Sequence, residues 1–203
     1  MLKKSKVLRP TLFLMVLSAV LGLLLGFVQD ISKEQIEINY YFEVQKALLY
    51  TVNIDTETML KEDINALFKT KMTEQRLRGI RYYVYKEDGD IQGYCFPFIG
   101  KGLWGTISGY IAIDPDANTL LGIVFTSHSE TPGLGARIDE LWFKEQFRGL
   151  DISSDGEYVK YGIGKEKVVD AITGATMTSD SVKTILESSI PELKKIVEED
   201  LDE

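Results

Sequence analysis

The residues with the clearest chemical character form one short stretch, Asp170–Thr176, with the sequence Asp-Ala-Ile-Thr-Gly-Ala-Thr. It follows the apolar pair Val168-Val169 and precedes a segment in which apolar residues recur at helical spacing, namely Val182, Ile185 and Leu186. A turn through Gly174-Ala175 that opens a helix directs main-chain N–H groups and the positive end of the helix dipole at whatever lies in the turn. Such a site favours an anion, above all a phosphate, and Thr176 places a hydroxyl beside it.

The same residue types also occur in an ordinary turn that leads into a helix. In that alternative Thr178 or Ser179 satisfies the first turn of the helix and no ligand is involved. N-caps are common and phosphate-binding turns are rare, so the pattern by itself favours the ordinary turn.

A second stretch, residues 126–138, has the sequence Thr-Ser-His-Ser-Glu-Thr-Pro-Gly-Leu-Gly-Ala-Arg-Ile. Pro132-Gly133 predicts a turn, and Gly135 permits a close approach of the backbone to a ligand. His128 is the single histidine of the chain, and a lone histidine is by itself no sign of chemistry. The stretch therefore indicates a loop that could contact a ligand.

Together the two stretches resemble the signature motifs of the FMN-binding domain family. The sequence Asp-x-x-Thr-Gly-Ala-Thr resembles its flavinylation motif, and His-x-Glu-Thr-Pro-Gly-Leu-Gly resembles the loop that lies against the flavin ring. Both occur in the covalent-flavin subunits of the Rnf ferredoxin:NAD oxidoreductase (G subunit) and the sodium-translocating NADH:quinone oxidoreductase (C subunit). Gly-Lys-Gly-Leu-Trp-Gly at 100–105 also resembles the latter, whereas the short chain leans toward the Rnf type. The resemblance covers residues 80–190.

The resemblance implies that a flavin transferase moves FMN from FAD onto the hydroxyl of Thr176 and so forms a phosphoester. A threonine hydroxyl is a weak nucleophile, which is why a dedicated enzyme must activate it. The family also carries a flavin-contacting lysine, for which Lys160 is the nearest match and Lys165 a rival. The remaining cofactor-binding residues implied in this way are Asp170, Thr173, Gly174, Ala175, Thr178, Glu130, Thr131, Leu134 and Gly135. Trp104 or Trp142 could stack on the flavin ring, although core packing is the default for tryptophan.

Composition excludes several other classes of site. The first 28 residues hold four basic side chains and no acidic one, so the remainder carries 19 basic and 31 acidic residues, a net charge of −12. Such a domain repels nucleic acid, which we exclude as a partner. One cysteine, Cys95, and one histidine permit no intrachain disulfide and argue against a zinc or iron–sulfur site within the chain. Redox chemistry would have to come from an organic cofactor or from partner subunits.

The N-terminal segment Thr11–Val28 contains no charged residue and has about the length that spans a bilayer. Lys3, Lys4, Lys6 and Arg9 precede it, so the positive-inside rule predicts a cytoplasmic N-terminus and an extracytoplasmic domain at the inner (plasma) membrane. A cleaved signal peptide is the alternative, but no small-x-small site follows the apolar run. We therefore expect a single-pass anchor.

The pattern of the remaining elements predicts an α+β fold. Helical spacing continues over residues 31–50 and 57–79, whereas residues 82–98 alternate as a hairpin with its turn at Asp88-Gly89. Two further strands follow at 107–113 and 120–126, which makes an antiparallel sheet. After it we expect a helix at 138–147 with Leu141, Trp142 and Phe147 inward, a strand at 158–163, a helix to about Ser189, a break at Pro191 and a last acidic helix. The predicted divisions are 1–29 (tail and anchor), 30–79 (helical connector) and 80–203 (FMN-binding domain).

The sequence thus predicts an electron-carrier subunit that docks on other membrane subunits of an ion-translocating oxidoreductase. Thr176 would serve as an attachment point, and no residue is assigned as a general acid or base. Two alternatives remain, a free-standing extracytoplasmic flavoprotein and a non-redox ligand-binding or assembly module.

Overall fold

The computed structural model describes residues 2–154, 156–162 and 169–202. The chain forms two compact units, Met1–Glu43 and Val44–Glu203. Helix α1 (Leu2–Thr51) accounts for the first unit and contributes its last residues to the second. From Val7 onward this helix is long and apolar enough to cross a membrane. The helical continuation expected over residues 31–50 is confirmed.

The second unit is built on one antiparallel sheet of six strands in sequential order. The strands are β1 (Met72–Leu77), β2 (Ile80–Glu87), β3 (Asp90–Lys101), β4 (Thr106–Ile113), β5 (Thr119–Ser127) and β6 (Leu150–Asp151). The predicted hairpin is formed by β2 and β3, and Asp88 and Gly89 at its turn have φ of 51° and 96°. Both values belong to the turn type that matches the twist of paired strands. The predicted antiparallel sheet is confirmed.

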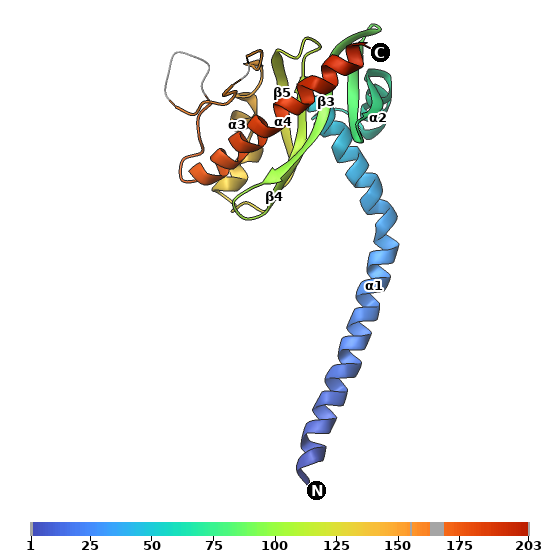
Figure 1. Ribbon diagram of the computed structural model, residues 1–203. Coiled ribbons are helices and arrows are strands. Elements are labelled where there is room, and N and C mark those ends of the chain that lie inside the picture. The colour runs from blue at the N-terminus through green and yellow to red at the C-terminus, as the bar shows by residue number, and fades with distance from the viewer. Residues whose placement is uncertain (1, 155, 163–168, 203) are drawn as a thin grey trace. The chain divides into compact units, whose positions relative to one another are not determined.

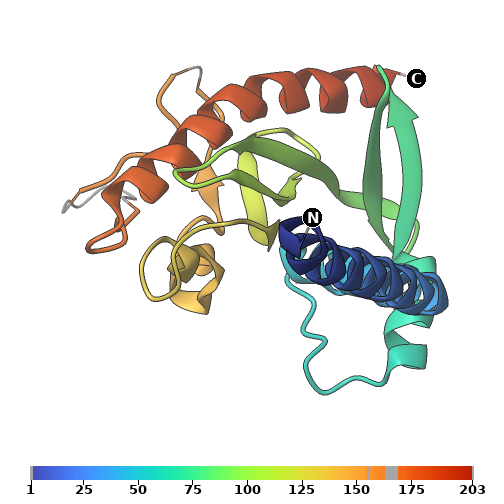
Figure 2. The ribbon, with the colours of Figure 1, turned by 90° about the horizontal axis from the view of Figure 1, so that it is seen from below.

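Helices cover both faces of this sheet because the side chains of each strand alternate between them. On one face Tyr82 and Tyr94 stack against Phe96, and helix α4 (Thr176–Asp202) lies across it (Figure 1). Figure 2 shows α4 extending along one side of the strands. On the opposite face Tyr83 contacts Phe68 of helix α2 (Lys61–Lys71). The predicted apolar face of α4 is buried, as Val182, Ile185 and Leu186 show.

Four predictions of secondary structure were wrong. Residues 72–77, expected to be helical, form β1 because they pair with β2 along their whole length. Residues 138–147 divide into a 3₁₀ helix η1 (Gly135–Asp139) and a short helix α3 (Leu141–Glu145). No strand forms over 158–162, where Tyr161 makes a single bridge with Val169; Ile163 lies outside the described residues. Helix α4 continues through Pro191, with the fully buried Ile190 and the buried Leu193 on either side.

The packing of the η1–α3 segment also differs from expectation. Phe147 is buried as predicted, but Leu141 is 62% exposed and Trp142 is 39% exposed. Phe143 fills the core in their place, in edge contact with Phe147. Residues 44–79, assigned to a connector with 30–43, belong to the second compact unit, where they supply β1 and α2.

Candidate functional site

The stretch Asp170–Thr176 forms a tight turn that leads directly into α4. The N–H of Ala175 donates to the carbonyl of Ile172 (2.9 Å), and Gly174 between them has φ of 79°, a conformation that favours glycine. The helix begins when the N–H of Ser179 donates to the carbonyl of Ala175 (3.1 Å). Ala175 is therefore the N-cap residue, and it has no side-chain oxygen with which to satisfy the N–H groups of the first turn. The exposed Thr176 is the first helical residue.

Neither Thr178 nor Ser179 plays the capping part that the ordinary-turn alternative assigned to it. The buried hydroxyl of Ser179 accepts from the N–H of Ile172 (3.0 Å) and lies 3.2 Å from the carbonyl oxygen of Ala175, to which it donates. Thr178 is also buried, and its hydroxyl donates to Oε2 of Glu130 (2.6 Å). Both side chains hold the turn in place from within, which leaves its outer side available to a ligand.

Glu130 joins three separate segments of the site. Its side chain is 5% exposed, and Oε2 accepts from Thr178 of α4. Oε1 accepts from the main-chain N–H groups of Leu103 (2.9 Å) and Trp104 (3.1 Å), at the tip between β3 and β4. Gly135 lies against the same pair, because a Cβ added there would be 2.5 Å from the Thr178 hydroxyl. The carboxylate thus connects the β3–β4 tip to the start of α4.

The loop after β5 is ordered by its own hydrogen bonds. The carbonyl of Thr131 accepts from the N–H groups of Leu134 and Ala136, both at 3.1 Å. Nδ1 of His128 accepts from the N–H of Glu130 (3.2 Å), and its Nε2 lies 2.8 Å from Oδ2 of Asp139. The side chain of Leu134 is 44% exposed and reaches the Gly174 turn. The loop therefore meets the attachment turn, as the two motifs predict.

A cleft of about 660 Å³ opens beside this turn, within the range of sites for small ligands. Its lining combines the turn with an arginine and two aromatic residues, namely Arg137, Trp142, Tyr161, Gly162, Asp170, Ala171 and Thr173. The guanidinium carbon of Arg137 lies 5.3 Å from the centre of the Trp142 ring. Burial raises the pKa of the Tyr161 phenol, whose hydroxyl donates to the carbonyl of Ser179 (2.7 Å).

Arg137 and Tyr161 were not among the residues predicted from the sequence. Arg137 follows the loop motif by two residues, and this position was the only signal that could have found it. Tyr161 carries no local signal, because only the fold brings it to the cleft. Trp142 lines the cleft, whereas Trp104 is 69% exposed at the β3–β4 tip.

The two lysine candidates differ in what the structure says of them. Lys160 is exposed, and its carbonyl accepts from the N–H of Val169 (2.9 Å), next to the motif. Lys165 lies outside the described residues. The side chain of Asp170 is exposed at the edge of the cleft.

Comparison with known proteins agrees with this geometry. Residues 102–190 match the model of the FMN-binding domain family. This part of the chain belongs to that family. The matched part of this FMN-binding domain contains both motifs, the Glu130 contacts and the cleft. The family predicted from the two motifs is thereby confirmed.

Two curated relatives are C subunits of Na(+)-translocating NADH-quinone reductases. The protein of Neisseria meningitidis serogroup B is 39% identical over 126 residues, which cover 55% of this chain and 48% of the relative. That of Vibrio alginolyticus is 33% identical over 108 residues, which cover 50% and 42%. The chain spans less than half of the length of either relative.

Solved structures share the fold of the FMN-binding domain. NqrC of Shewanella oneidensis superposes with a TM-score of 0.62 at 24% identity, covering 71% of this chain and 89% of that chain. The Na(+)-translocating NADH-quinone reductase protein of the same type from Parabacteroides distasonis gives a TM-score of 0.65 at 25% identity, covering 77% and 92%. These likenesses confirm the predicted fold class.

Proposed function

We propose that this protein is a membrane-anchored electron-transfer subunit that carries FMN as a phosphoester on Thr176. The observation that carries the proposal is the position of Thr176, exposed at the first residue of α4 beyond an N-cap without a side-chain oxygen. A phosphate esterified there would receive the free N–H groups and the positive end of the helix dipole. The family match of residues 102–190 supports the same cofactor.

The residues around the turn fit such a group. The cleft offers room beside Thr173 and Ala171, and Arg137 supplies a positive charge in its wall. Leu134 and Trp142 provide exposed apolar surface at its margin, against which a flat ring can pack. When bound, FMN would supply the electron-transfer chemistry, and the side chains would hold it, shield it and set its electrostatic surroundings. Thr131, Lys160 and Asp170 remain contact candidates on the basis of the resemblance.

We further propose that the subunit works in an ion-translocating complex of the NADH:quinone oxidoreductase type. The relatives in Neisseria and Vibrio are named as subunits of such a reductase, which favours this type over the Rnf type. The apolar helix α1 would hold the domain at the membrane and so raise its effective concentration near the other subunits. The basic N-terminal tail supports a cytoplasmic N-terminus and an extracytoplasmic domain.

The test is the in-gel flavin fluorescence of the denatured protein after co-expression with a flavin transferase. We expect a fluorescent band for the wild type and a dark band for Thr176→Ala, with Thr173→Ala as the matched control that keeps the acceptor hydroxyl. A dark wild type, when the transferase labels a known acceptor in parallel, would contradict the proposal and favour a non-redox binding module. Co-purification of membrane subunits then separates a complex from a free-standing flavoprotein.

A further inference from the structure

Residues 141–148, here termed the brace, contact both the end of α1 and the flavin-attachment motif. The brace comprises α3 and the turn that follows it. Trp142 at its beginning lines the cleft, whereas Glu145, Gln146 and Arg148 at its end make polar contacts with neighbouring segments. None of these three polar residues belongs to either motif.

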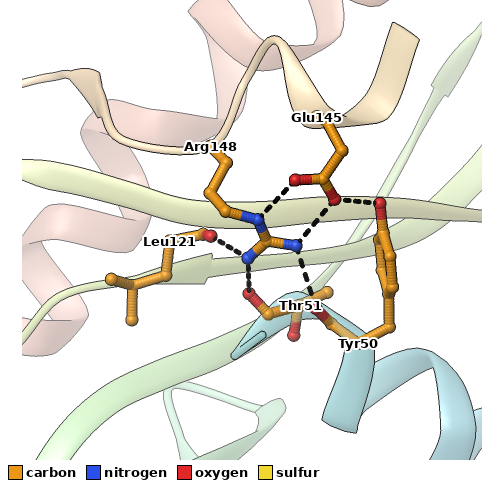
Figure 3. A network of polar contacts seen from close by, with 5 residues as sticks. All are labelled: Tyr50, Thr51, Leu121, Glu145 and Arg148. Atoms are coloured by element: carbon orange, nitrogen blue, oxygen red, sulfur yellow. Dashed lines mark hydrogen bonds and ion pairs between the residues drawn. The ribbon is translucent and has the colours of Figure 1, made fainter. Parts of the chain in front are cut away.

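Arg148 fastens the brace to α1 and to the sheet. Its guanidinium donates to the carbonyls of Tyr50 (3.2 Å) and Thr51 (3.2 Å) at the end of α1, and to the carbonyl of Leu121 (2.5 Å) in β5 (Figure 3). Two further bonds reach the carboxylate of Glu145, at 2.8 Å and 3.0 Å. All five N–H groups of the arginine therefore have acceptors. The last carbonyls of a helix lack partners within it, so Arg148 also caps α1.

Two more features tighten this joint. The hydroxyl of Tyr50 donates to Oε1 of Glu145 (2.5 Å), the oxygen that also accepts from Arg148. Gly122 of β5 lies directly under the helix end, because a Cβ added there would be 2.4 Å from the carbonyl oxygen of Thr51. The end of α1, β5 and the brace thus meet in one polar cluster.

Gln146 connects the other side of the brace to the attachment motif. Its Oε1 accepts from the N–H of Asp170 (2.6 Å), the first residue of the motif, and its Nε2 donates to the carbonyl of the same residue (3.4 Å). A side-chain amide that pairs with both main-chain groups of one residue fixes the position of that peptide segment. From Asp170 the turn reaches Thr176 in six residues.

We propose that Gln146 is a positioning residue for the flavin-attachment turn and that the Arg148–Glu145–Tyr50 cluster holds it in place. The brace then sets the geometry of the turn from the end of α1, in addition to the local contacts of Thr178 and Ser179. This role rests on the proposed function, in which the turn carries FMN. The contacts themselves exist in the protein before any flavin is attached.

Hydrogen exchange of the full-length apoprotein in detergent, made without a flavin transferase, tests the contacts first. For Gln146→Ala we expect amide exchange over residues 169–175 to rise about five- to tenfold, the effect of losing one hydrogen bond. Gln146→Glu keeps an acceptor for the Asp170 N–H and should remain near the wild type. Tyr50→Phe, which removes one hydroxyl from the cluster, should raise exchange in the same peptide about twofold. Tyr85→Phe is the control, because its hydroxyl donates to Glu87 on β2, away from the brace.

The second readout uses protein loaded with flavin by the transferase. We expect the visible circular dichroism and the fluorescence anisotropy of the flavin to change in Gln146→Ala and to be restored in Gln146→Glu. Unchanged exchange and unchanged flavin spectra in Gln146→Ala would overturn the proposal, as would a Tyr50→Phe effect confined to residues near 50 and 145. A wild type that takes up no flavin would instead count against the proposed function, since the exchange experiment needs no cofactor.

Discussion

At the scale of single residues, Glu130 shows how a motif residue can act through structure. The resemblance implies a flavin contact for it, yet both of its carboxylate oxygens already accept hydrogen bonds within the protein. The donors come from the β3–β4 tip and from α4, segments far apart in the sequence. Glu130 therefore arranges the surroundings of the attachment turn whether or not it also touches the cofactor.

Replacement of Glu130 by alanine should be costly for stability. The change leaves the buried hydroxyl of Thr178 without its acceptor and frees two main-chain N–H groups at the tip. Hydrogen bonds to a charged group are the strong class, so we expect a loss of about 3 kcal/mol in the free energy of unfolding. Chemical denaturation measures it, with Glu192→Ala on the exposed side of α4 as the control. Equal, small losses in both variants would show that the Glu130 bonds contribute little.

At the scale of elements, the sequence predicted those parts whose local pattern and packing agree. The β2–β3 hairpin is an example, since Asp88-Gly89 and the alternating side chains indicate the same structure. Residues 72–77 failed because five of these six side chains are not buried and only pairing with β2 makes them a strand. Pro191 failed in the opposite sense, because packing of α4 on the sheet outweighs the lost hydrogen bond.

The candidate site was predictable to a similar extent. Both motifs were recognised, and the fold brings Leu134 and Glu130 to the turn before Thr176. Arg137, Gln146 and Tyr161 were missed because their positions depend on segments that meet only in the folded chain. Their residue types are ordinary on any protein surface, so no local signal marks them.

The brace should give the element an acid-sensitive contact. Hydrogen bonds from Arg148 lower the pKa of Glu145 below its ordinary value near 4.5. A lowered pKa in the folded state means that the ionised form stabilises the protein above pH 4.5 and that this contribution is lost as the pH falls further. We expect the difference in Tm between the wild type and Glu145→Gln to be positive at pH 7 and to shrink steadily between pH 4.5 and pH 3. A difference that stays constant over this range would contradict the assignment.

At the scale of the whole molecule, charge and hydropathy divide the chain at its first segment. The apolar part of α1 follows four basic residues, and the remainder carries a net charge of −12. Only the N-terminal tail is therefore suited to the side of the membrane that retains positive charge. The single native thiol, Cys95, is buried within the second unit, and burial raises its pKa to about 12. It should react poorly with thiol reagents, because the thiolate is the nucleophile.

This inert thiol makes the orientation of the protein directly measurable in whole cells. We expect Ser153→Cys, at an exposed position of the domain, to be labelled by a membrane-impermeant maleimide added outside the cells. Ser5→Cys in the basic tail should be labelled only after the membrane is made permeable, and the wild type in neither condition. The expected pattern follows from the cost of moving the four tail charges across the bilayer, whereas the acidic domain carries no comparable restriction. Labelling of Ser5→Cys in intact cells, with Ser153→Cys protected, would reverse the topology and place the flavin-attachment turn in the cytoplasm.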